Sequence, residues 1–464
     1  MALAKLRLAW ANNLRQASAK PNQVRLTEAL KFWAKLGFIS FGGPAGQIAV
    51  LHQELVEKRR WISERRFLHA LNYCMLLPGP EAQQLVTYIG WLMHRSWGGI
   101  LAGTLFILPS LFILIGLSWV YLTFGQIPWI SAIFFGIKPA VTAIVVHAAV
   151  RIGKRTIHNQ ALQWIALASF LAIFILNLAF PIIVIIAALL GVWGGKKYPE
   201  YFQQKMGHGS NGAAQHLPAI IDDHTPTPEH AQFSIQKTIQ HSVVAAVFWL
   251  IPITALATFF GWKTLYPQIA WFFTKAAFLT FGGAYAVLPY VYQGAVDQFQ
   301  WLSAGQMMDG LALGETTPGP LIMIVAYVGY LAGHIQHLIG HSNPFWFGVV
   351  GACVATWFTF IPSFFFILVG GPFIESTHGK LSFTAPLTAI TAAVVGVIAN
   401  LGLFFAYHVF LPHGLGGSIS WISMVICLLA ALALFKYQKG VITVLIGSAL
   451  AGLLAYLSST LIGT

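Results

Sequence analysis

Long apolar stretches separated by short polar ones dominate this chain. A membrane-crossing helix needs about 20 apolar residues, and thirteen stretches are candidates for one. They lie near residues 29–53, 67–93, 98–123, 129–150, 161–178, 180–195, 240–261, 268–296, 307–333, 344–371, 381–406, 419–435 and 440–462. Hydrophobic residues make up 57% of the chain and charged residues 8%, whereas a soluble domain carries about 25% charged residues. The pattern predicts an all-α integral membrane protein.

The second half of the chain repeats the first at an offset of 240 residues. Pro-Gly-Pro occurs at 78–80 and again at 318–320, and Phe-Gly-Gly occurs at 41–43 and 281–283. Without a gap, residues 32–80 and 272–320 agree at 14 of 49 positions. An odd number of apolar stretches separates equivalent elements, so the second repeat is expected to be inverted in the membrane, as in many transporters.

This duplication divides the chain into five parts. They are a basic N-terminal segment (1–28), a first repeat (29–195), a polar linker (196–239), a connecting transmembrane helix (240–267) and a second, inverted repeat (268–464).

The distribution of charge predicts how the chain is oriented. The formal net charge is +13, but 21 of the 26 Lys and Arg fall in segments on one side of the expected topology, as the positive-inside rule requires. We therefore expect a multi-pass protein of the bilayer with its N-terminus and the 196–239 linker in the cytoplasm. Binding of nucleic acid is not expected, because no soluble basic domain is present.

The basic loop 57–66 decides how many times the chain crosses the membrane. If all thirteen stretches cross, this loop lies outside the cell with five positive charges. If stretches 1, 2, 8 and 9 are re-entrant hairpins, it lies in the cytoplasm with the other basic segments. We favour four hairpins and nine crossings, with thirteen crossings and broken helices as the alternative.

Proline and glycine break the same two stretches in each repeat. Proline removes a backbone donor and glycine permits positive φ, so both interrupt helices. In lipid such interruptions survive only when they are buried in protein or face a watery cavity. Duplicated broken helices therefore point to a transporter's binding site. The structural alternative is that the glycines and prolines only allow kinked helices to pack closely.

Three segments of the first repeat resemble the chromate ion transporter family in its long, two-domain form. They are Phe41–Gly46, Glu57–Glu64 and Leu71–Ala82; in the second repeat, Phe278–Gly283 and Thr316–Pro320 are similar to that family's second domain. The resemblance spans about residues 29–460. It implies a secondary active transporter that exports chromate, or a related oxyanion such as sulfate, across the bacterial inner membrane.

A tetrahedral dianion is bound by backbone N–H groups, hydroxyls and cations. The candidate substrate-binding residues therefore lie at the breaks or are lysines within apolar stretches. They are Lys35, Phe41, Gly42, Gly43, Pro44, Pro78, Gly79, Pro80, Lys138, Lys275, Phe281, Gly282, Gly283, Thr316, Thr317, Pro318, Gly319 and Pro320. Lys35 and Lys275 are equivalent positions six residues before Phe-Gly-Gly; the alternative for each is that it extends to the headgroups.

Carboxylates and arginines near the breaks add further candidates. Glu81 and Glu315 flank the two breaks and are candidates for carrying a coupling proton. Arg59, Arg60, Arg65 and Arg66 form a loop that either attracts anions or only sets orientation. The repeats differ at Ala284, where the first has Pro44, and at Leu321, where it has Glu81, so the two copies need not contribute equally.

Two other functions remain to be weighed against coupled transport. A passive anion channel would have a similar sequence, whereas an intramembrane enzyme would need clustered titratable groups, and the acidic residues here are scattered. No enzyme activity, cofactor or metal is expected, and His334, His337 and His341 are read as part of a polar external loop. The choice of anion, proton coupling and a homodimer stay open.

Overall fold

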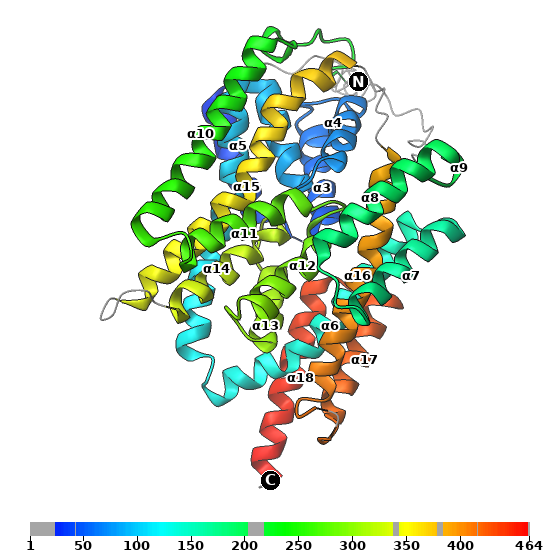
Figure 1. The fold of residues 1–464 in the computed structure, drawn as a ribbon. Helices are drawn as coiled ribbons and strands as arrows, with labels where there is room; N and C mark the ends of the chain where they lie inside the picture. The colour runs from blue at the N-terminus through cyan, green and yellow to red at the C-terminus, as the bar shows by residue number, and fades with distance from the viewer. Residues whose placement is uncertain are drawn as a thin grey trace, which may run out of the picture.

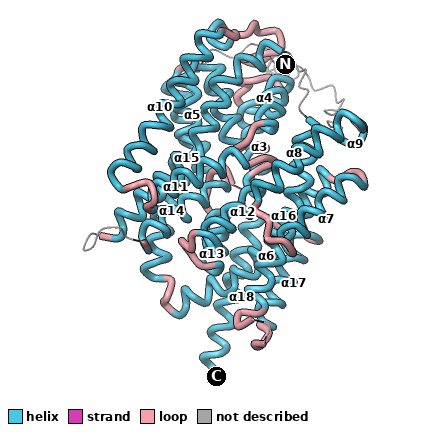
Figure 2. Tube along the Cα trace, viewed as in Figure 1, coloured by secondary structure: helices cyan, strands magenta, loops and turns pink. Residues whose placement is uncertain are grey.

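The computed structural model describes residues 24–41, 43–202, 218–336, 343–377, 384–414 and 416–462. Within these ranges every regular element is a helix, and the loops between them are mostly short (Figure 2). The expectation of an all-α protein is confirmed.

The two repeats contribute helices in the same order (Figure 1). The first contains α2 (Leu26–Ile39), α3 (Gly43–His52), η1 (Gln53–Lys58), α4 (Glu64–Leu76), α5 (Glu81–Phe124), α6 (Pro128–Thr156), α7 (Gln160–Phe174) and α8 (Phe180–Lys197). The connecting region contains α9 (Pro199–Phe202), η2 (Glu229–Ala231) and α10 (Ile235–Phe260). The second contains α11 (Leu265–Leu279), α12 (Ala284–Tyr292), η3 (Gln293–Gln298), α13 (Ala304–Thr316), η4 (Leu321–Met323), α14 (Ile324–Ile335), α15 (Pro344–Thr377), α16 (Thr384–Phe410), α17 (Trp421–Phe435) and α18 (Val441–Ile462).

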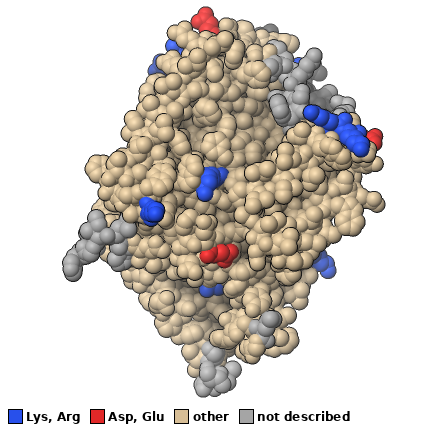
Figure 3. Space-filling view, viewed as in Figure 1, with Lys and Arg blue, Asp and Glu red and all other residues tan. Residues whose placement is uncertain are grey.

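Seven of the described helices are long and apolar enough to cross a membrane. They are α5, α6, α8, α10, α15, α16 and α18, and the shorter helices α7 and α17 are also apolar. The face shown in Figure 3 carries only scattered Lys, Arg, Asp and Glu side chains across its middle. A broad uncharged surface of this kind is what a lipid-embedded protein presents, so the chain is a multi-pass membrane protein.

The first two apolar stretches fold as hairpins whose ends meet at one end of the molecule. His94 Nε2 lies 2.9 Å from the Val24 carbonyl, so the end of the second hairpin lies beside the start of the first. Ser63, at the tip between them, donates its N–H to the Ile221 carbonyl over 2.9 Å. His230, a little further along the same linker segment as Ile221, lies 2.9 Å from the Trp91 carbonyl near the end of the second hairpin. The tip and that end therefore lie on one side, as expected for hairpins, whereas a crossing stretch would separate them by about 30 Å.

The long element α5 is itself bent back at Arg95, which has φ +59°. Glycines allow its two arms to pack closely. A Cβ on Gly90 would lie 2.7 Å from the Ala102 Cβ, and one on Gly99 would lie 2.8 Å from the Thr87 carbonyl oxygen. The arm from Glu81 to Met93 thus completes a re-entrant hairpin, and the remainder of α5 crosses the membrane.

The hairpins of the second repeat open toward the opposite end. The Phe180 N–H, at the turn between α7 and α8, donates to Gln293 Oε1 over 3.0 Å. Phe345, at the start of α15, contacts Trp119 near the distal end of α5, with ring centroids 6.3 Å apart. Trp119 lies at the end of α5 that is distant from the bend at Arg95, as expected if the second repeat is inverted relative to the first.

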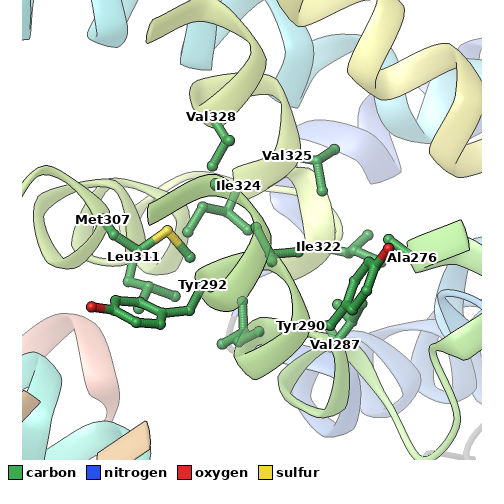
Figure 4. Close-up of a cluster of buried hydrophobic side chains, with 14 of the residues drawn as sticks. Ala276, Val287, Tyr290, Tyr292, Met307, Leu311, Ile322, Ile324, Val325 and Val328 are labelled. Carbon is green, nitrogen blue, oxygen red and sulfur yellow. The ribbon is translucent and has the colours of Figure 1, made fainter. Parts of the chain in front are cut away.

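The remaining long helices exchange partners between the repeats. α6 of the first repeat packs against α17 and α18 of the second, and α16 of the second packs against α7 and α8 of the first. Apolar side chains from α11, α12, α13 and α14 fill the core of the second pair of hairpins (Figure 4). The repeats therefore form one interleaved unit.

Part of the polar linker packs against the first pair of hairpins. Residues 218–231, called the strap below, bury Ile221 and Ala231 among apolar side chains of those hairpins. Ser63 Oγ donates to Asp223 Oδ1 over 2.6 Å, and His230 Nε2 lies 2.9 Å from the Trp91 carbonyl. The strap and the tip of the first hairpins therefore lie on the same side of the membrane.

Candidate functional site at the crossing of the broken helices

The two Pro-Gly-Pro breaks are each held by the other repeat. The Gly79 N–H donates to the Thr280 carbonyl over 2.7 Å, and the Gly319 N–H donates to the Ser40 carbonyl, also over 2.7 Å. Thr280 and Ser40 are equivalent positions, each directly before a Phe-Gly-Gly. The four breaks consequently meet in two reciprocal pairs near the centre of the fold.

Serines on the long helices contact the same glycines. A Cβ on Gly79, which has φ +122°, would lie 2.6 Å from Ser363 Oγ on α15. A Cβ on Gly319, which has φ +98°, would overlap Ser110 Oγ on α5, and the Ser110 hydroxyl donates to the Pro318 carbonyl. Both glycines are required by their conformation and by the contact with the opposite repeat.

The double glycine of the second repeat faces the first repeat. Gly283 has φ +99°, and a Cβ there would lie 3.8 Å from Pro44 Cγ and 4.0 Å from Glu81 Oε1. Gly43, the equivalent of Gly283, also has a positive φ, +68°, whereas Gly42 lies outside the described residues. The Glu81 carboxylate therefore reaches the backbone of the other repeat's break.

Helix N-termini converge on this crossing. α3 begins at Gly43, α5 at Glu81 and α12 at Ala284, and the turn η4 leads into α14 from Leu321. The first N–H groups of a helix have no partner within it, and they carry the positive end of the helix dipole. The crossing is thus a place where backbone can bind negative charge.

The two carboxylates at the breaks have different partners. Glu315 is buried and accepts a hydrogen bond from the Tyr285 hydroxyl. Arg151 of α6 acts electrostatically on Glu315, and Arg155, one turn further along α6, acts on Glu81. α6 therefore brings two cations toward carboxylates from both repeats, a relation that the sequence did not reveal.

The hydroxyls of Thr316 and Thr317 are engaged within their own helix. Thr317 Oγ1 donates to the Leu313 carbonyl over 2.6 Å, and Thr316 Oγ1 lies within donor distance of the Ala312 and Leu313 carbonyls. In this structure both hydroxyls cap the end of α13. Their role as donors to an anion stays a prediction.

The three candidate lysines lie away from the crossing. Lys35 and Lys275 are on the exposed faces of α2 and α11, and Lys275 Nζ lies 6.0 Å from the centroid of the Trp271 ring. Lys138 on α6 instead forms an ion pair with Asp309 of α13 at 3.4 Å. Binding of the anion by these lysines stays a prediction.

Side chains of the basic loop are divided between packing and exposure. Arg59 lies over the Phe32 ring, 4.4 Å from its centroid, and 3.6 Å from a Glu54 carboxylate oxygen. The Lys58 ammonium, hydrogen-bonded to Glu54 over 2.7 Å, holds the pKa of that carboxyl below its ordinary value. Arg66 pairs with Glu375 at 3.0 Å, whereas Arg65 is exposed.

Sequence reasoning missed several buried polar side chains at the breaks. They are Gln47, Gln83, Gln84, Ser110 and Ser363. Gln84 Nε2 donates to the Pro78 carbonyl over 2.8 Å, and the Gln47 amide donates to the Gly319 carbonyl. The signal available was that these glutamines sit at the breaks of otherwise apolar stretches.

The external histidine cluster can be followed only in part. His334 stacks on Tyr330, with ring centroids 5.8 Å apart, while His337 and His341 lie outside the described residues. Among the residues that the structure describes, no group of three or more His, Cys, Asp or Glu side chains could hold a metal ion.

Inverted repeats whose broken helices cross inside a multi-pass membrane protein define a membrane transport protein. A family model described as chromate transporter matches residues 27–192 and 267–453. The chain therefore belongs to the chromate transporter family.

Named relatives are similar over nearly their whole length. The chain is 28% identical to a chromate transport protein of Cupriavidus metallidurans, over 93% of each chain. It is 30% identical to a chromate transport protein of Pseudomonas aeruginosa, over 94% of each, and 30% identical to a probable chromate transport protein of Synechococcus elongatus, over 86% of this chain and 89% of the relative. No solved structure matches the chain. The names of these relatives point to transport rather than catalysis.

Proposed function

We propose that this protein exports chromate, or a related oxyanion such as sulfate, across the bacterial inner membrane by secondary active transport. The anion is bound where the broken helices of the two repeats cross. The N-terminus, the basic loop and the strap face the cytoplasm, as the distribution of Lys and Arg favours.

The reciprocal pairing of the breaks is the observation that carries this proposal. Gly79 and Gly319 each bind the backbone of the other repeat, which brings the beginnings of α3, α5 and α12 toward one region. An oxyanion there would accept hydrogen bonds from N–H groups that no helix uses, in a setting shielded from bulk water.

Proton coupling is part of the proposal. Export of an anion against its gradient needs an energy source, and a carboxylate that binds a proton in one state and releases it in another supplies one. Glu81 and Glu315 are the candidates at the breaks. An ionised carboxylate beside the anion repels it, so the charge on either group is linked to the binding and release of the anion.

Transport into inverted membrane vesicles tests the proposal directly. Vesicles from cells that produce the protein should accumulate labelled chromate when a pH gradient is imposed, and unlabelled sulfate should compete. Vesicles with the Gly283→Leu variant, at matched protein level, serve as the comparison because the added side chain would occupy the crossing. Equal uptake with and without the protein would contradict chromate transport.

The same vesicles separate a coupled transporter from a passive channel. A channel lets chromate equilibrate but never exceed the outside concentration, whatever the pH gradient. Accumulation above the outside concentration that collapses when a protonophore removes the gradient is the result expected here.

A further inference from the structure

Asp309 is a buried carboxylate that belongs to neither break. It lies on α13 and is only 3% exposed. Its Oδ2 atom accepts a hydrogen bond from the Tyr121 hydroxyl over 2.8 Å and lies 3.4 Å from Lys138 Nζ. Its Oδ1 atom is buried and has no hydrogen-bond partner among the described residues. One of the two oxygens of this buried carboxylate is therefore left without a hydrogen bond from the described residues.

The surroundings of Asp309 make a lasting charge costly. Asp309 is enclosed within the fold, and the adjacent Met308 is buried as well, at 2% exposed. An ionised carboxylate in such a setting needs a cation and satisfied hydrogen bonds. Ionisable groups within the membrane are by default functional rather than structural.

Few groups can balance the charge on Asp309. Among the described residues, those that act electrostatically on it are Lys138 of α6 and Tyr121 of α5. Tyr327 of α14 stands against Tyr121, with ring centroids 5.9 Å apart, but its own hydroxyl donates to the Gln306 carbonyl over 2.9 Å. In the part of the chain that the structure describes, Lys138 alone forms an ion pair with Asp309.

Lys138 is placed so that it can leave the pair. Its side chain is 32% exposed, in contrast to the 3% of Asp309. Gly305 leaves room beside the ammonium group, since a Cβ there would lie 3.6 Å from Lys138 Nζ. When Lys138 turns to water, the carboxylate is left without a cation, and proton binding removes the charge.

A second ion pair provides the contrast. Arg66 lies 3.0 Å from Glu375, whose other oxygen accepts from the Tyr88 hydroxyl. An arginine keeps its proton under all cellular conditions, so its partner stays ionised. Both pairs join a hairpin of one repeat to a long helix of the other. Of the two, only the Lys138–Asp309 pair allows a proton to replace the basic side chain as the partner of the carboxylate.

We propose that Asp309 is a proton-binding site that couples proton movement to anion export. The proton from water forms an O–H bond at the unpartnered Oδ1 atom while Lys138 leaves, and the proton is released when Lys138 returns. This inference rests on the proposed function. Asp309 lies about 9 Å along α13 from Glu315, at 1.5 Å of rise per residue, so its charge cycle need not repel an anion at the crossing.

Purified full-length protein in liposomes offers two separable readouts. The first is exchange of labelled for unlabelled chromate at equal pH, which needs binding and movement but no net proton transfer. The second is accumulation driven by a pH gradient, recorded with proton flux by an internal pH-sensitive dye. Asp309→Asn should exchange chromate at the wild-type rate but lose both gradient-driven accumulation and chromate-dependent proton flux. Asp297→Asn, which alters an exposed carboxylate of η3 in the neighbouring hairpin of the same repeat, should keep all three activities.

Several outcomes would overturn the assignment. If the Asp309→Asn protein still accumulates chromate in response to the gradient, Asp309 is not the coupling site. Loss of exchange together with accumulation, in protein that is inserted and monodisperse, would place Asp309 in the transport step itself. If Glu81→Gln or Glu315→Gln alone shows the pattern expected for Asp309→Asn, coupling resides at the breaks. Wild-type protein that performs neither exchange nor accumulation would contradict the proposed function and not this assignment in particular.

Discussion

Gln84 occupies in the first repeat the position that Ile324 occupies in the second, and both side chains are fully buried beside their breaks. The same contrast separates Glu81 from Leu321, three residues earlier. Figure 4 shows Ile324 within an apolar cluster, whereas Gln84 donates to the Pro78 carbonyl. The two breaks share a backbone geometry but not a side-chain chemistry, and at these two positions after the break the polar side chains belong to the first repeat.

Gln84→Leu should therefore abolish most transport. The substitution leaves the buried Pro78 carbonyl without its partner, at a cost of about 1–3 kcal/mol, and removes a polar group from the crossing. Ile324→Leu, at the equivalent position, is the matched control and should transport normally. Labelled chromate uptake into inverted vesicles measures both variants at equal protein level, and a similar loss in the two would argue against the asymmetry.

Gly79→Ala should lower the stability of the protein. Gly79 has φ +122°, and the new Cβ would lie 2.6 Å from Ser363 Oγ, so strain of the order of 1–3 kcal/mol is expected. Gly116→Ala is the control, because a Cβ there meets no described atom within 4 Å. Thermal unfolding in detergent should show a lower midpoint for Gly79→Ala alone; equal midpoints would mean that the crossing tolerates a side chain.

The hypothesis that Lys35 and Lys275 attract the anion predicts a change in affinity. Lys35→Gln and Lys275→Gln remove a positive charge and should weaken apparent affinity about tenfold, which corresponds to about 1.4 kcal/mol. Lys35→Arg keeps the charge and should retain more activity. Concentration dependence of chromate uptake is the measurement. Wild-type affinity in both glutamine variants would show that the lysines only extend to the headgroups.

The orientation of the hairpins can be read by cysteine labelling in a background without Cys74, Cys353 and Cys427. Arg65 and Lys263 are both exposed and are expected on opposite sides of the membrane. A membrane-impermeant reagent should label Arg65→Cys only in inverted vesicles and Lys263→Cys only in intact cells with a permeabilised outer membrane. Labelling of both from outside the cell would contradict the hairpin arrangement and favour thirteen crossings.

Repetition in the sequence was sufficient to predict the main architecture. The paired Pro-Gly-Pro and Phe-Gly-Gly motifs located the breaks, because only proline and glycine interrupt an apolar helix so abruptly. The charge of the 57–66 loop favoured hairpins, and the contact between Ser63 and Ile221 is in keeping with that arrangement. These features depend on local sequence and on the bilayer, so they can be read without a structure.

Contacts between distant segments could not be predicted in the same way. Nothing in the apolar stretch around Asp309 indicates that Lys138 and Tyr121 approach it, since all three lie on different helices. Such relations depend on how the repeats interleave, which is a property of the folded chain and not of any one segment.

The reciprocal bonds at the breaks have a consequence for synthesis of the protein. Gly79 is bound by Thr280, a residue translated about 200 positions later. While the ribosome makes the intervening chain, the first pair of hairpins has entered the bilayer without the backbone partner that its break requires. During that time the unpaired backbone groups of the first break need other partners, which the insertion machinery, lipid headgroups or water must supply. Folding of the transporter is therefore completed only when the second repeat has been inserted.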